Sequence, residues 1–280
     1  MNLSLCIATY NEEENIDYPL SSAYDLVDEV VIVDGGSNDK TVELAKKYGN
    51  KVRVIINNNS SMFHQNKQRA IDEAKGKWIL QLDADEALSD ELKKEIMDVL
   101  KNRILVEKLK KNSKKNLRID NHDEKEIVAY YIPRKNWFLN RFLQKGGSYP
   151  DYTIRLYKKG RAYFPCISVH ENVKVNGKIG YLKNPILHYA YPNFSRYLMR
   201  FDRYTTFDAE ELFKKYSKKK LTKIKEIWLF VDYFFIKPLF WFLKTYVRHR
   251  GFLDGFSGFV FCLFSSIRFW VIYIKFKVKS

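Results

Sequence analysis

The stretch Trp78-Ile79-Leu80-Gln81-Leu82-Asp83-Ala84-Asp85-Glu86 joins a short apolar run to three carboxylates. Residues 78–82 have the length and composition of a strand buried on both faces of a parallel sheet. Side chains two positions apart on an extended chain lie on the same side, so Asp83 and Asp85 can converge. Carboxylate pairs of this kind suit Mg²⁺ or Mn²⁺. The stretch therefore predicts a metal site at a sheet edge, and the alternative is a strand followed by a helix that begins near Ser89.

Three further apolar runs of strand length precede this one. They occupy residues 3–8, 29–34 and 51–56. The segments between them have helical patterns and occupy residues 12–24, with Asn11 as the predicted N-cap, then 39–48 and 63–74. Four strands that alternate with three helices predict a parallel α/β sheet, because right-handed crossovers cover both of its faces.

The later part of the chain changes in character. Residues 101–126 are rich in Lys, Asn and Glu, which predicts a helix extension or a solvated insertion. Strands are expected at 127–133, 151–157 and 185–189, and an amphipathic helix at 194–213. The expected domains are a catalytic domain over 1–213, with a donor half over 1–100 and an acceptor half over 127–192, and a basic, aromatic helical region over 214–280.

Composition narrows the class of partner. The formal net charge of +16 on 280 residues indicates an anionic partner, such as a nucleotide, nucleic acid or an acidic membrane surface. The three cysteines, Cys6, Cys166 and Cys262, are scattered, which indicates a reducing compartment rather than a disulfide framework. Met1 leads directly into the first strand with no signal peptide, so the catalytic part is expected in the cytosol.

The C-terminal quarter has two long apolar, aromatic runs at 227–242 and 252–274, preceded by a strongly basic segment. Each run approaches the roughly 20 residues that cross a bilayer. Asp232, Lys237 and Arg268 interrupt them, however, and flanking lysines and aromatics are typical of interfacial helices. We therefore expect helices that lie in the plane of an anionic membrane surface. A spanning hairpin and burial inside an oligomer are the alternatives.

Polar loops follow three of the predicted strands. They are Thr9-Tyr10-Asn11-Glu12, Asp34-Gly35-Gly36-Ser37-Asn38-Asp39 and Asp83-Ala84-Asp85-Glu86. The carboxyl ends of parallel strands meet at one sheet edge, where ligands bind. Short loops with carboxylates and amides suit a nucleobase and ribose, and a divalent ion suits a diphosphate. The chain has neither a phosphate-loop pattern nor G-x-G-x-x-G, which disfavours NTP hydrolysis and NAD binding.

In order and spacing, three segments resemble the inverting glycosyltransferases of family 2, which have the GT-A fold. They are Ile7-Ala8-Thr9-Tyr10-Asn11-Glu12-Glu13, residues 31–41, and Leu82-Asp83-Ala84-Asp85-Glu86. The runs 149–157, 169–171 and 251–255 are similar to the subgroup that includes lipopolysaccharide-core β-glucosyltransferases. The resemblance covers most of the chain and implies a mostly parallel, Rossmann-like sheet flanked by helices. The apolar tail adds C-terminal amphipathic helices to that architecture.

The resemblance implies a pocket for the donor. The residues that would line its nucleobase and ribose part are Thr9, Tyr10, Asn11 and Glu12. Asp34 would contact the base, and Asp83 would face the ribose or a metal. Lys67 or Arg69, on the helix before the fourth strand, would neutralise phosphate.

The resemblance also implies a metal and a catalytic base. Asp85 would ligate Mg²⁺ or Mn²⁺ directly, with Asp83 and His170 as further candidate ligands. Inversion requires a carboxylate that accepts the proton of the acceptor hydroxyl. Asp151 is the first candidate for this base and Glu171 the second, because Pro150 stands where relatives often carry an acidic residue.

Three more side chains have open assignments. Arg155 is expected to hold either its own strand or the diphosphate. Trp137 and Tyr149 are expected to pack in the core or to stack on a sugar ring.

These features predict metal-dependent transfer of a hexose from a nucleotide diphosphate sugar, with a UDP-sugar favoured. The acceptor would be a saccharide or lipid-linked molecule of cell-envelope glycan synthesis, at the cytoplasmic face of the inner membrane, with the enzyme peripheral or monotopic. The alternatives are a nucleotidyltransferase acting on sugar phosphates and a non-catalytic nucleic-acid or membrane binder. The acidic loop after the first strand disfavours a nucleotidyltransferase. The lysines lie beside apolar helices, which favours a membrane over nucleic acid as the partner. Oligomeric state is open.

Overall fold

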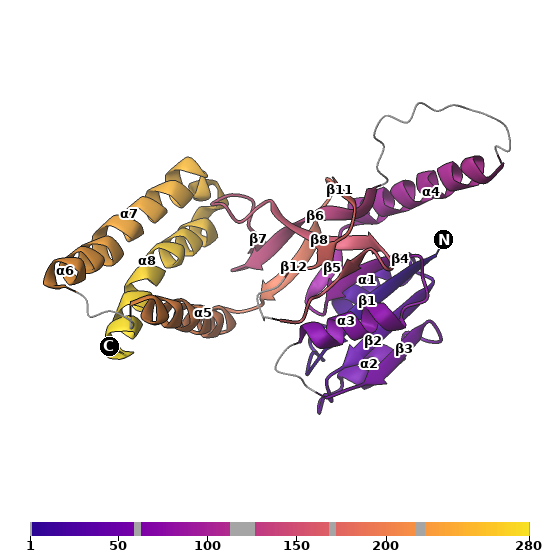
Figure 1. Ribbon diagram of the computed structural model, residues 1–280, viewed down its shortest axis with the longest axis horizontal. Helices are drawn as coiled ribbons and strands as arrows, with labels where there is room; N and C mark the ends of the chain where they lie inside the picture. The colour runs from indigo at the N-terminus through magenta and orange to yellow at the C-terminus, as the bar shows by residue number, and fades with distance from the viewer. Residues whose placement is uncertain (1, 59–62, 113–126, 168–171, 217–221, 280) are drawn as a thin grey trace. The chain divides into compact units, whose positions relative to one another are not determined.

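The structure is a computed structural model that describes residues 2–58, 63–112, 127–167, 172–216 and 222–279 (Figure 1). The chain divides into two compact units. The first consists of Met1–Arg134 and Asp151–His188, and the second of Lys135–Pro150 and Tyr189–Ser280. Residues 189–213, which we expected in the catalytic domain, therefore group with the C-terminal helices.

The first unit begins with strands and helices in alternation (Figure 1). Its elements are β1 (Leu3–Thr9), α1 (Asp17–Ala23), β2 (Glu29–Asp34), α2 (Thr41–Lys46), β3 (Val52–Ile56), α3 (His64–Glu73), β4 (Trp78–Asp83), β5 (Glu86–Leu88), α4 (Asp90–Asn112), β6 (Ile127–Phe138), β8 (Asp151–Lys158), β9 (Ala162–Tyr163), β10 (Lys174–Val175), β11 (Lys178–Tyr181) and β12 (Ile186–Tyr191). Strands β6 and β12 continue into the second unit beyond Arg134 and His188. Helix α4 extends into the lysine-rich segment as far as Asn112, and residues 113–126 lie outside the described chain.

The main sheet has the strand order β3-β2-β1-β4-β8-β6-β12-β5. Strand β1 pairs in parallel with β2 and β4, and β2 pairs in parallel with β3. Strand β8 is antiparallel to both β4 and β6. The predicted α/β fold is confirmed, but the sheet is mixed rather than mostly parallel, because antiparallel strands continue the parallel half.

Alternation along the parallel strands explains why both faces of the sheet are buried. Leu3, Leu5 and Ile7 of β1 lie in one core cluster together with residues of α1 and α4. Cys6 points to the other face and packs with Ala70 of α3. All of these side chains are fully buried. This two-sided burial fixes the register, because a slip of one residue would exchange the two faces.

The turn before β4 is held by the carboxylate of Glu29. Its Oε1 accepts hydrogen bonds from Ser4 Oγ at 2.6 Å, from Gly76 N at 3.1 Å and from Lys75 N. Although partial burial would raise it, these hydrogen bonds hold the pKa of Glu29 below its ordinary value of 4.5. A Cβ on Gly76 would lie 2.4 Å from Ser4 Oγ, so this turn has no room for a side chain.

We expect Glu29→Gln to lower the free energy of unfolding at pH 7 by about 1–2 kcal/mol, because a charged acceptor of three hydrogen bonds is lost. Since the folded pKa lies below the unfolded one, this stabilisation is present above about pH 4.5 and disappears as the pH falls through the folded pKa. Urea unfolding at pH 7 and pH 3 tests this. Glu43→Gln, at an exposed i,i+4 pair with Lys47, is the control and should be nearly neutral. A Glu29→Gln effect of equal size at both pH values would contradict the assignment.

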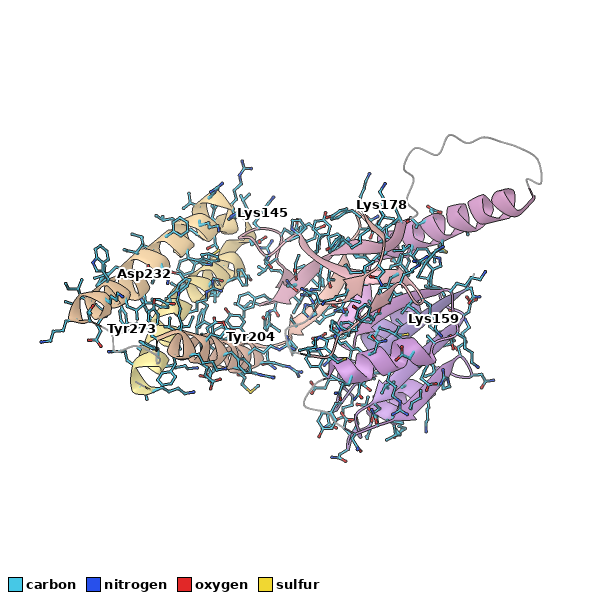
Figure 2. The ribbon with its side chains drawn as sticks, viewed as in Figure 1. Lys145, Lys159, Lys178, Tyr204, Asp232 and Tyr273 are labelled. Atoms are coloured by element: carbon cyan, nitrogen blue, oxygen red, sulfur yellow. The ribbon has the colours of Figure 1, made fainter. Side chains whose placement is uncertain are left out.

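The second unit is mainly helical (Figure 1). Its elements are β7 (Arg141–Phe142), α5 (Phe194–Tyr216), α6 (Lys223–Val231), the π-helical η1 (Asp232–Ile236), α7 (Lys237–Phe242), the π-helical η2 (Leu243–Arg248), the 3₁₀ turn η3 (Gly251–Asp254) and α8 (Gly255–Lys279). The segment from α6 to η2 is one continuous helical limb, since its junction residues keep right-handed helical dihedrals. Helix α8 packs against both α5 and α7. Figure 2 shows the side chains of this unit, with Tyr204 on α5, Asp232 on η1 and Tyr273 on α8 labelled.

One side chain of α8 compensates for the proline inside the limb, and a second bonds to the carbonyl of the proline. Pro238 has no N–H, so the carbonyl of Phe234 lacks the donor that an α-helix would supply. The indole Nε1 of Trp270 donates to that carbonyl at 2.8 Å, and Ser266 Oγ donates to the carbonyl of Pro238 at 2.6 Å. Trp270 of α8 therefore gives the carbonyl of Phe234 a donor in place of the N–H that Pro238 lacks.

Candidate active site

The loop after β2 is organised around Asp34, which is fully buried. Its carboxylate accepts hydrogen bonds from Thr9 Oγ1 at 2.9 Å, Gly36 N at 3.0 Å, Ser37 N at 2.8 Å and Ser37 Oγ at 2.6 Å. These four bonds use about all the acceptor positions of a carboxylate. Gly36 has a φ of +83°, which the turn requires. Asp34 therefore shapes the loop, and its contact with a nucleobase stays a prediction.

Asn11 connects the loops after β1 and β2. Its N–H donates to Ser37 Oγ at 2.8 Å, and its Oδ1 accepts from Asn38 N at 2.9 Å. Its φ of 52° lies in the left-handed region, and helix α1 begins only at Asp17. The predicted N-cap role of Asn11 was therefore wrong, because its side chain bridges two loops instead. Glu12 belongs to the same junction, since its N–H donates to Thr41 Oγ1 at 2.7 Å.

The strand ends that carry these loops lie at one sheet edge, as predicted. The register pairs Thr9 with Asp34 across β1 and β2, and Ala8 with Asp83 across β1 and β4. Tyr10 is 41% exposed at this edge. The structure thus brings the predicted donor-binding loops together.

Asp83 is held between two cations of the chain. Its Oδ1 lies 2.5 Å from Lys67 Nζ, and its Oδ2 lies 2.6 Å from Arg155 Nη2. Burial would raise its pKa, but Arg155 and Lys67 hold the pKa of Asp83 well below its usual range. Both oxygens of Asp83 are paired with cations, and its role towards a metal or a ribose stays a prediction. Lys67, expected to face phosphate, is buried and faces Asp83.

Arg155 is the centre of a buried network. Its Nη1 donates to Gln81 Oε1 at 2.5 Å, and its Nη2 donates to Glu86 Oε1 at 2.7 Å as well as to Asp83. Glu86 is fully buried, and its Oε1 also accepts from Arg134 Nη1 at 3.2 Å. Burial alone would lower the pKa of Arg155, but Asp83 and Glu86 outweigh it and raise the pKa above its usual value. The open assignment of Arg155 therefore resolves towards this carboxylate network.

A β-bulge directs Arg155 into the network. Tyr130 of β6 faces Leu156 of β8, whereas the next residue, Tyr131, faces Ile154. Arg155 is the extra residue of this irregularity. Bulges of this kind redirect a side chain, often beside an active site. Four consecutive residues of β8, Ile154 to Tyr157, are consequently buried instead of alternating.

Asp151, the first candidate for the base, is the first residue of β8 and pairs with Arg134 across the strands. Arg134 donates to Asp151 Oδ2 twice, from Nε at 3.0 Å and from Nη2 at 2.7 Å. The Asp151 side chain is 40% exposed. Within the described chain no donor is found for Oδ1, so this oxygen is available to a substrate hydroxyl. Glu171, the second candidate, lies outside the described residues.

Asp85 has a neighbour that the sequence did not indicate. His188 Nε2 lies 3.4 Å from Asp85 Oδ2, and both side chains are mostly buried. Strand β12 brings the histidine there by pairing His188 with Glu86 of β5. His170, the predicted ligand, lies outside the described residues. Among the residues that are described, no group of three His, Cys, Asp or Glu side chains is placed to hold a metal.

Residues 4–160 match the model of glycosyl transferase family 2. The chain belongs to this family. A family 2 glycosyltransferase is an enzyme that transfers a sugar, which confirms the predicted class. The resemblance seen in the three strand-end loops is confirmed as well, since all three lie inside the matched range.

Relatives of this family 2 glycosyltransferase extend the match to most of the chain. A protein named uncharacterized glycosyltransferase, from Rickettsia typhi, is 30% identical over 272 residues, which are 92% of this chain and 80% of the relative. The lipopolysaccharide core biosynthesis glycosyltransferase LpsC of Rhizobium meliloti is 23% identical over 263 residues, 92% of this chain and 85% of LpsC. The mannosyltransferase PcManGT from Pyrobaculum calidifontis, solved with GDP-Man and Mn²⁺, has a TM-score of 0.51 at 12% identity and covers 100% of this chain and 88% of its own. The last comparison supports the GT-A fold.

The two aromatic residues proposed for sugar stacking lie in the second unit of the glycosyltransferase. Trp137 contacts Phe142 edge-on at 4.9 Å between ring centroids, and it lies 5.9 Å from the ring of Tyr189. Lys135 Nζ lies 5.4 Å from the ring centroid of Tyr149. Trp137 therefore has a packing role, and sugar stacking by either residue stays a prediction.

Proposed function

We propose that this glycosyltransferase is an inverting hexosyltransferase. Its donor would be a nucleotide diphosphate sugar, with a UDP-sugar favoured, and its acceptor a saccharide or lipid-linked molecule. The relative LpsC, named for lipopolysaccharide core biosynthesis, supports a role in cell-envelope glycan synthesis. We place this work at the cytoplasmic face of the inner membrane.

One observation carries the proposal. A continuous chain of ion pairs runs from Asp83 through Arg155, Glu86 and Arg134 to Asp151. It connects the exit of β4, where the donor diphosphate is expected, with the candidate base on β8. Buried pairs of this kind hold their members in one geometry, because breaking any of them leaves a charge buried alone.

The proposed reaction uses the exposed carboxylate at the end of this chain. Asp151 Oδ1 accepts the proton of the acceptor hydroxyl, whose oxygen attacks the anomeric carbon from the face opposite the diphosphate. The bond between that carbon and the diphosphate oxygen breaks, and the diphosphate leaves with the electron pair. Configuration at the anomeric carbon inverts. Arg134 holds the other oxygen of Asp151, so the base keeps its orientation.

We propose that Asp85, rather than a carboxylate of the ion-pair network, would hold a divalent ion. Three carboxylates and three cations are members, counting Lys67, and they neutralise one another. Asp85 has the imidazole of His188 as a neighbour, with its Oδ2 3.4 Å from His188 Nε2. The Asp85 carboxylate fits Mg²⁺ or Mn²⁺ whose remaining ligands are diphosphate oxygens and water. When bound, the ion would stabilise the negative charge of the departing diphosphate.

We expect a UDP-sugar together with Mn²⁺ to raise the thermal unfolding midpoint by about 5–10 °C at a hundredfold excess over Kd. A panel of UDP-, GDP- and dTDP-sugars with Mn²⁺, Mg²⁺ or EDTA identifies the donor. NMR of the product made from an α-linked donor then reports the anomeric configuration. A β-linked product supports inversion, whereas an α-linked product would refute it. Pyrophosphate release from UTP and a sugar phosphate would instead indicate a nucleotidyltransferase.

A further inference from the structure

The helical limb from α6 to η2 exposes several large apolar side chains. Phe235 is 60% exposed and Leu239 is 62% exposed. Ile227, Trp228 and Leu243 continue this surface at 64%, 64% and 49%. Phe235, Leu239 and Leu243 are four residues apart, so they lie along one side of the limb. Exposed apolar surface of this extent marks an interaction site rather than ordinary solvent-facing structure.

Helix α8 has exposed apolar side chains of its own, and aromatic contacts join it to the limb. Phe256, Phe259, Trp270 and Ile274 are 76%, 39%, 40% and 52% exposed. Phe259 contacts the ring of Phe242 edge-on at 6.3 Å, and Trp270 stacks on Phe234 at 6.3 Å. Aromatic side chains that remain partly exposed therefore bridge the two helices. We call the joined surface the docking face and define it by Phe235, Leu239, Phe256, Phe259, Trp270 and Ile274.

Basic residues lie at both ends of the docking face. At one end, Lys223 and Lys225 begin α6, and the C-terminal lysine Lys277 lies near them, because its Nζ is 3.6 Å from Glu226. At the other end, Arg248 and Arg250 are exposed. Residues 214–280 contain fifteen Lys and Arg against three Asp and Glu, so they account for most of the net charge of +16. An apolar surface between cationic ends is complementary to an anionic lipid surface.

The position of helix α5 distinguishes a helix α8 that spans the bilayer from one that lies in its plane. Gly251–Lys279 is long and apolar enough to span a bilayer by length and composition, with a mean hydropathy of 1.7. However, α5 packs along α8, and Lys275 of α8 pairs with Asp202 at 2.7 Å while Lys279 pairs with Glu210 at 2.7 Å. Charged residues occur along the whole of α5. A span would carry this helix into hydrocarbon, where its charges are costly.

Charged groups midway along both helices support the same conclusion. Asp232 and Lys237 form an ion pair at 2.7 Å halfway along the limb. Arg268 lies in the middle of α8, with its guanidinium 4.8 Å from the ring centroids of Trp241 and Phe269. Its Nε is buried and has no hydrogen-bond partner among the described residues. Helices that lie flat keep these groups near the headgroups and water.

We propose that the docking face inserts in the plane of one leaflet of an anionic membrane, with the lysines and arginines at its ends on lipid phosphates. The surface acts independently of the sugar transfer proposed above. Its partner is the lipid bilayer itself, and a second copy of the chain is the competing occupant that the experiments below distinguish.

The first test is co-sedimentation of the full chain with vesicles of phosphatidylcholine alone or with 30% phosphatidylglycerol. We expect binding to the anionic vesicles that weakens with salt. Leu239→Asp together with Phe256→Asp should reduce this binding at least tenfold. Met199→Asp together with Tyr204→Asp, on exposed apolar positions of α5, is the matched control and should bind as the unaltered protein does. Equal loss in both double variants would overturn the proposal.

The basic ends are tested separately. Lys223→Gln together with Lys225→Gln should weaken binding to anionic vesicles about tenfold and reduce its salt dependence. Circular dichroism and thermal unfolding establish that each variant folds. Donor hydrolysis or transfer to a soluble acceptor should be unchanged in all of them, so a failure of the transfer proposal would not be confused with a failure of this one. Unchanged vesicle binding would refute the role of these lysines.

The depth of Trp228 in the bilayer and the oligomeric state of the protein distinguish in-plane insertion from a membrane span and from docking of a second copy. The fluorescence difference between the unaltered protein and Trp228→Phe reports one exposed indole, and lipids brominated near the headgroup should quench it more than lipids brominated near the chain end. Stronger quenching by the deep label would mean a span and would overturn in-plane docking. If sedimentation velocity shows a dimer that Leu239→Asp with Phe256→Asp converts to monomer while vesicle binding is unaffected, the face belongs to a second copy.

Discussion

Asp85→Ala is expected to lower kcat at least a thousandfold, which corresponds to about 4 kcal/mol of transition-state stabilisation. Asp85 follows β4, and its Oδ2 lies 3.4 Å from His188 Nε2. Its removal would take away the main ligand of the ion that stabilises the leaving diphosphate. Steady-state kinetics over a range of Mn²⁺ concentrations measure the loss, which excess Mn²⁺ should not restore.

Two further variants make this result specific. Asp90→Ala removes a carboxylate that is 83% exposed on α4, and it should leave kcat unchanged. Asp85→Asn keeps the side-chain volume of a residue that is only 16% exposed, so it separates lost chemistry from lost packing. Isothermal titration should show that both Asp85 variants bind Mn²⁺ more weakly in the presence of donor. Near-native turnover of Asp85→Ala would remove Asp85 from the metal site.

Asp151→Asn is expected to lower kcat by about 10²–10⁴ while the Kd for the donor stays within a few fold. An amide oxygen still accepts from Arg134, so the side chain keeps its place, but it no longer takes a proton from the acceptor hydroxyl. Single-turnover kinetics give the chemical step, and calorimetry gives the donor affinity.

Glu171→Gln is the comparison that assigns the base. If Asp151 is the base, Glu171→Gln keeps most of the turnover. If Asp151→Asn stays active and Glu171→Gln loses turnover at unchanged donor affinity, the base is Glu171. An Asp151→Asn variant that loses donor affinity and turnover in equal measure would show that the carboxylate binds substrate rather than activating the acceptor.

Much of this site could be predicted from the sequence, because buried parallel strands need continuous apolar runs. Residues 29–34 and 78–82 satisfy that need and end in carboxylates, so the meeting of Asp34 and Asp83 at one edge follows from strand order alone. The predicted family depended on the same segments. Hydrophobic periodicity and loop composition therefore suffice to predict the position of a functional side chain that lies directly at the end of a buried strand.

The remaining parts of the site depend on non-local pairings that local patterns do not encode. The bulge at Arg155 interrupts the regular alternation of side chains along β8, and the residue pattern of β8 does not predict it. His188 is over a hundred positions from Asp85 and meets it only because β12 pairs with β5. The left-handed backbone of Asn11 depends on its bonds to the neighbouring loop. A sequence rule based on helix caps consequently assigned Asn11 to the wrong element.

The proline in the α6–η2 limb has a mechanical consequence. Phe234 and Pro238 take hydrogen bonds from Trp270 and Ser266 of the facing helix. If one helix slid past the other by a turn, about 5.4 Å, both hydrogen bonds between the helices would break, and the carbonyl of Phe234 would lose the donor that replaces the N–H of Pro238. The two helices should thus resist ratcheting and move as one rigid plate, with a fixed pattern of aromatic side chains on its surface.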